Sequence, residues 1–319
     1  MNLEGQVIIE IALDRHRPDV RVALSQPDLI NRLMRGKTPS DALEIIPSIF
    51  SLCGMAQLQA AQNALNAASD SNQPCIEQLA TRQCLTDMES LRENALRVAM
   101  DWPRFLGEPI DRTHLRPLMR LLHDLQDVMC GPNVIQNVVD KSRHATQDAL
   151  DVIARAESIL ENIIFAEPLD KWRQRHAPDL VSEWAAQSKT TAGRLLTHIC
   201  ISGWRDAGAT RIIPLQPLSL EDVHDLLRKP ASEPTPASLP QFTEAPETTL
   251  LARHVDDQRL SRPDAQMHRI AGLWQRLTAR LIELAILPQR MRELIKGHTQ
   301  PTRGRTAAPG IGLGEVSAA

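Results

Sequence analysis

Two short runs of apolar residues lie near the start of this sequence. Residues 7–13 and 20–24 are rich in the β-branched residues Val and Ile and alternate in part with polar residues. Such runs on either side of a polar connection are typical of paired strands, so they predict a β-hairpin over residues 5–25. Two strands alone are only marginally stable, and the hairpin is therefore expected to pack on another part of the protein.

From residue 38 onward the apolar positions recur every three or four residues, as they do on one face of a helix. Thr38 is a good N-cap and is followed by Pro39 and Asp41, so a helix is expected to start here, to be kinked or broken at Pro47, and to end near Leu52. A second helix is expected between a Cys-Gly junction and residue 69. Further helices are predicted over residues 78–101, 112–129, 142–165, 168–187, 190–203 and 264–287, the last one ended by Pro288.

These patterns predict one domain over residues 1–319 of the mainly α (α+β) class, a helical bundle with a small N-terminal hairpin. The segment 229–247 contains five prolines among Ala, Ser, Thr and Glu residues. This composition is typical of a solvated connector. The final segment is rich in Gly, Ala and Pro, shows no closing element and stops in mid-pattern, so a C-terminal truncation stays open. After the hairpin, the expected parts are a helical body (26–228), the Pro-rich connector (229–249), C-terminal helices (250–298) and the tail (299–319).

Composition excludes several classes of protein. The 36 basic and 39 acidic residues give a formal charge of −3, which argues against a nucleic-acid partner. Five cysteines without regular spacing are not a disulfide framework and indicate a reducing compartment, hence a cytoplasmic protein. The uncharged stretch 45–69 contains several Ser, Gln and Asn residues. They would be unsatisfied in lipid, so no membrane insertion is expected.

Most signatures of catalysis or metal binding are absent. The sequence contains no CxxC, HExxH, GxSxG, phosphate-loop or EF-hand pattern. His198 and Cys200 would point to different sides of a helix, which is poor geometry for one metal ion. Cys75, Cys84, Cys130 and Cys200 are each expected to be small buried apolar side chains.

The segment 253–305 is strongly basic. It carries eleven Lys and Arg residues against five acids, a net charge of +6 in a chain of −3. The segment is interpreted either as a solvated helix face or as a docking surface for an acidic partner. No aromatic residues interleave the charges as stacking on nucleic acid would require.

Cys53 differs from the other cysteines because it precedes Gly54 at the start of a predicted helix. The helix dipole and the free N–H groups there favour the thiolate, which is the form that binds metals. The residues around Cys53 in the sequence are uncharged, and they would also keep water away from a bound metal group. Cys53 is therefore a candidate metal ligand, with a buried structural cysteine as the alternative.

Three segments, in the same order along the chain, resemble motifs of the [NiFe]-hydrogenase large subunit. Residues 36–42 and 51–56 resemble Gly-basic-Asp-Pro-Arg-Asp-Ala and Arg-Ile-Cys-Gly-Val-Cys, and the hairpin upstream matches the strand pair that precedes them. Residues 246–253 resemble Glu-Val-Gly-Pro-Leu-Ala-Arg, and residues 310–319 resemble the start of Gly-x-Gly-x-x-Glu-Ala-Pro-Arg-Gly. The resemblance implies the fold of the large subunit.

The departures from these motifs change the implied function. Ser51 stands in place of the Arg, Ala56 in place of the second Cys, and Ala60 in place of the His that usually follows. No C-terminal Cys-x-x-Cys pair is present, whereas a Ni–Fe centre in that family is held by four thiolates. This degenerate pattern resembles the HupK/HoxV family of hydrogenase assembly proteins.

That resemblance implies a scaffold rather than an enzyme. It would hold the Fe(CN)2(CO) fragment transiently through Cys53, with Gly54 beside the cargo and no nickel, and would work with maturation chaperones and the hydrogenase large subunit. One alternative is a metal-free adaptor that binds the chaperones as a large-subunit mimic, with a role for the basic face at Arg276 and Arg280. The other is an enzyme with residual hydrogenase chemistry.

Overall fold

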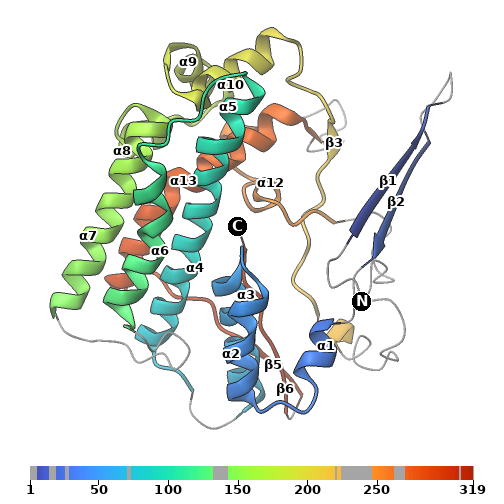
Figure 1. Cartoon of the computed structure of the whole chain (residues 1–319), viewed down its shortest axis with the longest axis vertical. Helices are drawn as coiled ribbons and strands as arrows, with labels where there is room; N and C mark the ends of the chain where they lie inside the picture. Colours follow the sequence, from blue (N-terminus) through green and yellow to red (C-terminus); the bar gives the residue numbers. More distant parts are fainter. Residues whose placement is uncertain are drawn as a thin grey trace.

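Long helices form the body of the protein, and the N-terminal hairpin projects to one side of it (Figure 1). The computed structural model describes residues 6–13, 19–25, 29–69, 73–131, 143–219, 221–223, 246–261, 270–308 and 310–318. The helices are α1 (Leu29–Met34), α2 (Pro39–Ile49), α3 (Gly54–Ala68), α4 (Ile76–Leu96), α5 (Trp102–Phe105), α6 (Leu115–Met129), α7 (Arg143–Leu160), α8 (Leu169–Arg173), α9 (Pro178–Gln187), α10 (Thr191–Ile201), α12 (Leu250–Arg253) and α13 (Leu273–Ile295). The strands are β1 (Gln6–Ala12), β2 (Asp19–Ser25), β3 (Thr210–Arg211), β4 (Ile270–Ala271), β5 (Arg305–Ala308) and β6 (Ile311–Leu313).

The predicted class is confirmed, because helices dominate and a small hairpin precedes them. The strands of the described ranges form separate antiparallel pairs, β1–β2, β3–β4 and β5–β6. Two predicted helices are continued by π-helical turns: Arg97–Asp101 joins α4 to α5, and Glu161–Phe165 extends α7. The predicted boundaries at residues 101 and 165 match the ends of these turns. The described side chains of β1 and β2 are exposed, so the expectation that the hairpin packs on another part of the protein is wrong for the described residues.

The core lies where α4 and α13 pack on one another, with α6 and α7 completing the bundle. Leu91, Leu121, Ile153 and Leu284, one from each of these helices, are fully buried. Burying one such side chain contributes roughly 1.5–3 kcal/mol. Leu, Ile and Ala supply most of this core, as the shortage of aromatic residues predicts.

Two prolines lie inside helices that they were expected to kink or end. α2 runs through Pro47 to Ile49, and α13 runs through Pro288 to Ile295. Pro288 is buried within the helix packed on α4, so tertiary packing offsets the hydrogen bond that proline cannot make. Arg173 donates to the carbonyl of Ala285 (2.7 Å) in the turn before Pro288. The predicted helix end at Pro288 is therefore wrong.

The single helix predicted over residues 168–187 is also wrong. The structure has two helices there, α8 and α9, with a break before Pro178. Proline favours the first turn of a helix, and its ring clashes with a preceding helical turn. Pro178 accordingly starts α9, and the residues before it end α8.

The tail does contain a closing element, contrary to expectation. β5 and β6 form a hairpin that lies along α3 (Figure 1). Glycine makes this contact possible: a Cβ added to Gly304, Gly312 or Gly314 would lie 2.1, 1.9 or 1.9 Å from a backbone carbonyl oxygen of α3. The glycines of the tail thus serve close packing on α3.

The connector expected over residues 229–249 lies mostly outside the described residues. Its last part is described, where Glu247 forms an isolated parallel bridge with Pro214 and leads into α12. No helix within the described ranges combines the length and apolarity needed to cross a bilayer.

Candidate functional site

Cys53 lies in the turn between α2 and α3 and is the N-cap residue of α3. Its side chain is half-buried, and Gly54 is buried behind it. A Cβ added to Gly54 would lie 3.4 Å from the carbonyl oxygen of Pro47, an ordinary contact distance. The structure therefore places the thiol at the start of a helix, as the sequence predicts.

The amides at this helix start are not free, which corrects the expectation for Cys53. The carboxylate of Glu89, on α4, accepts hydrogen bonds from the N–H groups of Met55 (2.9 Å) and Ala56 (3.1 Å). Glu89 is 3% exposed, so a buried acid lies at the helix end that appeared uncharged in sequence. Burial raises the pKa of Glu89 even though both backbone N–H groups and Arg92 favour its charged form.

The raised pKa of Glu89 predicts a pH dependence of stability. Its ordinary value is 4.5, so the folded state retains the proton at higher pH than the unfolded chain does. The stability that Glu89 adds through its raised pKa is greatest below pH 4.5, where both states bind the proton. This stability is lost as the pH rises through the raised pKa of the folded state. Glu89→Gln should therefore lose less stability than the wild type over this range, as measured by urea unfolding at a series of pH values. Glu44→Gln, at an exposed carboxyl of α2, is the matched control, and equal pH slopes for wild type and Glu89→Gln would contradict the prediction.

A cavity of about 740 Å³ lies between α4, α12, α13 and the tail. It brings together residues from two motif segments of the sequence: Glu247 and Arg253 from one, Glu315 from the other. Arg290 and Gln83 contribute from α13 and α4. Cys53 is not among the residues that line this cavity. Along α3, a rise of about 9 Å separates Cys53 from Gln59, which belongs to the polar network described next.

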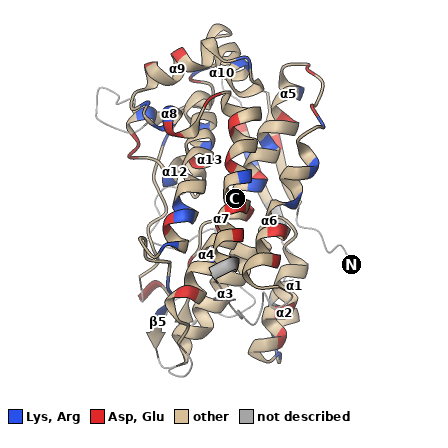
Figure 2. Ribbon diagram, turned by 90° about the vertical axis from the view of Figure 1, so that its left-hand side faces the viewer, with Lys and Arg blue, Asp and Glu red and all other residues tan. Residues whose placement is uncertain are grey.

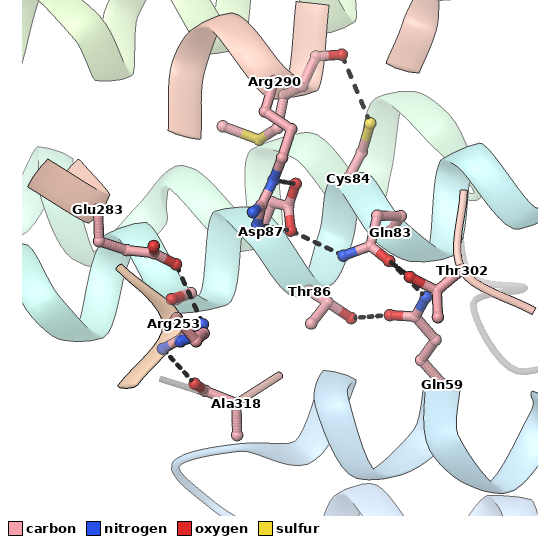
Figure 3. Close-up of polar contacts among 12 residues, drawn as sticks. Gln59, Gln83, Cys84, Thr86, Asp87, Arg253, Glu283, Arg290, Thr302 and Ala318 are labelled. Carbon is pink, nitrogen blue, oxygen red and sulfur yellow. Dashed lines mark hydrogen bonds and ion pairs between the residues drawn. The ribbon is translucent and has the colours of Figure 1, made fainter. Parts of the chain in front are cut away.

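A network of buried and half-buried polar side chains connects α3, α4 and α13 beside this cavity (Figure 3). Arg290 donates two hydrogen bonds to the carboxylate of Asp87, at 2.7 and 2.5 Å. Asp87 is 1% exposed. Burial alone would lower the pKa of Arg290, but its hydrogen bonds to Asp87 and the charge of Asp87 outweigh burial and raise that pKa. Gln83 donates to Asp87 (2.9 Å) and accepts from Gln59 (3.1 Å). These bonds fix the Arg290 guanidinium at the cavity wall.

A second buried acid holds Arg253 at the same wall. Glu283 accepts a hydrogen bond from Arg253 (3.1 Å) and lies 2.6 Å from Nε2 of His254. Burial alone would raise the pKa of Glu283, but the hydrogen bond with His254 and the charge of Arg253 outweigh it and lower that pKa. Arg253 also donates to the carbonyl of Ala318 (2.9 Å), which ties the tail to α12. Sequence reasoning did not find Asp87, Glu89 or Glu283, because acids on predicted helices carry no sign of being buried.

Several arginines in the described part of the basic segment pair with acids of the same chain. Figure 2 shows basic and acidic residues mixed over the ribbon. Arg276, expected to belong to a docking face, pairs with Glu247, and Arg280 lies close enough to Arg97 and Asp101 to interact electrostatically with both. The other pairs are Arg253–Glu283, Arg259–Asp257, Arg290–Asp87, Arg292–Glu157 and Arg305–Glu315. Within the described part of the segment, most arginines are therefore paired with acids, and the basic charge is not gathered on one open face.

The remaining candidates do not form a metal centre. Within the ranges that the structure describes, no three His, Cys, Asp or Glu residues lie close enough together to hold an ion. Cys84 and Cys130 are buried as expected, whereas Cys75 is exposed. The ring of His198 packs against Trp204, with centroids 5.9 Å apart. Iron binding at Cys53 thus stays a prediction.

Comparison with known proteins gives relatives for parts of the chain. No profile of a protein family matches the sequence. The chain is 39% identical over 84 residues to the hydrogenase expression/formation protein HupV of Azotobacter chroococcum mcd 1, which covers 26% of this chain and 23% of HupV. It is 34% identical over 123 residues to the hydrogenase expression/formation protein HupK of Azotobacter vinelandii, covering 37% of this chain and 34% of HupK. The resemblance to the HupK family is confirmed.

A second HupK, from Rhodobacter capsulatus, is 33% identical over 88 residues, 27% of this chain and 26% of that protein. The matched segments thus span about a quarter to a third of the length of these HupK and HupV relatives. The fold is similar over a much longer stretch to the Ni-Fe-Se hydrogenase of Desulfovibrio vulgaris Hildenborough. The TM-score is 0.57 at 11% identity for the reduced state and 0.56 at 12% for the as-isolated oxidised state, with 93% of this chain covered in each and 79% and 80% of the hydrogenase chain. This likeness shows that the HupK-like chain shares the hydrogenase fold.

Proposed function

We propose that this chain is a non-catalytic assembly scaffold in the maturation of [NiFe] hydrogenase, and that it works in the cytoplasm. Two findings support this role: the relatives are named hydrogenase expression/formation proteins, and the fold is similar to that of a hydrogenase. The loss of the second motif cysteine argues against hydrogen chemistry, because one thiolate cannot replace four.

The observation that carries the proposal is the pair of Cys53 and Ala56 at the start of α3. Cys53 is half-buried, whereas Ala56, in the position of the second motif cysteine, is buried with its N–H bound to Glu89. This motif therefore offers a single thiolate. One soft thiolate is sufficient for an iron that already carries strong-field cyanide and carbonyl ligands, and one bond can be exchanged.

The cargo of the scaffold is the Fe(CN)2(CO) fragment, without nickel. Binding deprotonates the Cys53 thiol, the proton goes to solvent, and the sulfur donates an electron pair to iron with no change of oxidation state. Transfer is a ligand exchange, in which thiolates of the hydrogenase large subunit replace Cys53. The partners are the large subunit and the maturation chaperones that bring the fragment.

Infrared spectroscopy tests this role directly. The protein is produced together with the hydrogenase maturation machinery, and spectra are recorded in the CN and CO stretching region. We expect bands in the wild type and their loss in Cys53→Ala. Cys75→Ala, which removes an exposed cysteine elsewhere, is the matched control and should keep them.

Absence of bands in the wild type would overturn the scaffold role and favour the metal-free adaptor. Unchanged bands in Cys53→Ala would overturn the proposal that Cys53 is the ligand of the scaffold. Hydrogen-dependent dye reduction that is lost in Cys53→Ala would instead show an enzyme.

A further inference from the structure

Arg82, on α4, is a buried cation that no carboxylate of the described residues neutralises. Its side chain is 9% exposed, and its Nε and Nη1 groups have no hydrogen-bond partner. Other arginines of low exposure, such as Arg253 and Arg259, each contact a carboxylate. A buried charge that is neither paired nor fully hydrogen-bonded is strongly unfavourable. Arg82 therefore indicates a place where an anion binds.

The thiol of Cys75 lies in the direction of the Arg82 side chain. Residues seven apart share one face of a helix and are about 10.5 Å apart along its axis, and helical side chains lean toward the N-terminus. The long side chain of Arg82 thus extends back along α4 toward Cys75. Burial lowers the pKa of Arg82 to about 10, and the charge of the Cys75 thiolate opposes this effect. The unpaired guanidinium and the thiol are therefore neighbours.

Cys75 is open to reagents from solvent. It is the N-cap residue of α4, a helix of 21 residues, and it is exposed, whereas the other four cysteines are buried or half-buried. Its N–H donates to the side chain of Gln78 (2.9 Å). Glu77, the acid of the first helical turn, lies about 200° around the helix from Cys75 and so on another side. Reactive cysteines are typically found at exposed helix starts beside a positive charge.

We propose that Cys75 is a site of reversible thiolation by small disulfides that carry carboxylates, with Arg82 as the group that binds the carboxylate. The Cys75 thiolate attacks one sulfur of the disulfide, so that a new S–S bond forms and the old one breaks. The departing thiolate takes up the proton that Cys75 released. Cys75 is thereby oxidised, the departing thiol is reduced, and a free thiol reverses the exchange.

The unpaired charge of Arg82 makes this site selective. The attached group places its carboxylate at the start of α4, beside a guanidinium that lacks a partner in the described residues. Arginine can bury its stem and bring its charged head to the surface, so Arg82 can reach a carboxylate held at Cys75. An uncharged disulfide would react with the thiol but would leave Arg82 unpaired.

Two disulfides of different charge test the proposal on the purified, reduced full chain. Modification of Cys75 by the dianionic dithiobis(nitrobenzoate) and by the uncharged dithiodipyridine is followed by peptide mass spectrometry. Relative to free cysteine, Cys75 of the wild type should favour the anionic reagent. Arg82→Gln should lower the ratio of the two rates at least about threefold, as expected for the loss of one nearby charge.

Two further variants separate the charge of Arg82 from its effect on folding. Arg82→Lys keeps the charge and should keep most of the preference for the anionic reagent. Arg116→Gln, which removes an exposed arginine of α6, is the matched control and should leave the ratio unchanged. An unchanged ratio in Arg82→Gln, or an equal loss in Arg116→Gln, overturns the proposal.

Oxidised glutathione, a disulfide that carries carboxylates, gives a second measurement on the wild type. It should attach to Cys75 faster than to the half-buried Cys53 and Cys200, and dithiothreitol should remove it. Slower attachment at Cys75 than at these two cysteines would contradict the proposal. Neither measurement bears on iron binding at Cys53, which the infrared spectra test separately.

Discussion

Replacing Arg290 with methionine should destabilise the fold by about 3 kcal/mol, because the buried carboxylate of Asp87 loses the half-buried partner that satisfies it. Asp87 is 1% exposed and receives both hydrogen bonds from Arg290. Without the guanidinium, its carboxylate keeps the hydrogen bond from the side-chain amide of Gln83. Urea unfolding at neutral pH measures the loss.

The double variant Asp87→Leu with Arg290→Met separates charge from packing. Replacing both ions by apolar side chains of similar size is often nearly neutral, so this variant should recover most of the lost stability. Arg303→Met, at an exposed arginine of the same basic segment, should change stability by less than about 0.5 kcal/mol. If Arg290→Met proved no more harmful than Arg303→Met, the ion pair would not be a structural element.

Gly312→Ala should detach the tail from α3 at a cost of about 1–3 kcal/mol, the usual penalty of overpacking. The added methyl would lie 1.9 Å from the carbonyl oxygen of Ala64, and a backbone atom inside a helix cannot move aside. Hydrogen exchange of β5 and β6 should therefore accelerate. Because residues 315–318 form one wall of the cavity, its Arg253 side would also open to water.

The matched control for this variant is Gly310→Ala in the same hairpin. Gly310 has a φ of +74°, and nothing lies within 4 Å of an added Cβ. The substitution therefore adds backbone strain of about 1 kcal/mol without a clash. If exchange in β6 were equally fast in both variants, backbone strain within the hairpin would account for the effect, and close packing of Gly312 on α3 would not be needed to hold the tail.

Local patterns were sufficient for much of the helical fold. Thr38 forms the expected capping box with Asp41, and the helical period around Ile153 marks α7 correctly, because both depend on residues within one or two turns. The predictions that failed depended on distant partners. Pro288 continues a helix because its neighbours are buried against α4, and the tail glycines pack on a helix some 250 residues earlier in the chain.

The candidate site shows the same division. The motif predicted that Cys53 starts a helix, and this is confirmed. The acid that accepts from the helix amides comes from α4, 34 and 33 positions further along the chain than Met55 and Ala56. Glu247, Arg253 and Glu315 belong to the segments that resemble hydrogenase motifs, and the structure brings them to one cavity. No spacing in sequence could show this, because the chain between them folds back through α13.

By itself, the sequence determined the helical class, the N-terminal hairpin, the single motif cysteine and the resemblance to hydrogenase assembly proteins. These properties follow from hydrophobic period, capping residues and short motifs, all of which act over a few neighbouring residues. The tertiary structure decided which charges are paired, which acid is buried at the start of α3, how the tail packs on α3 and that the strands of the hairpin stay exposed. Burial and ion pairing depend on what lies across a helix interface, and only the folded chain sets those distances.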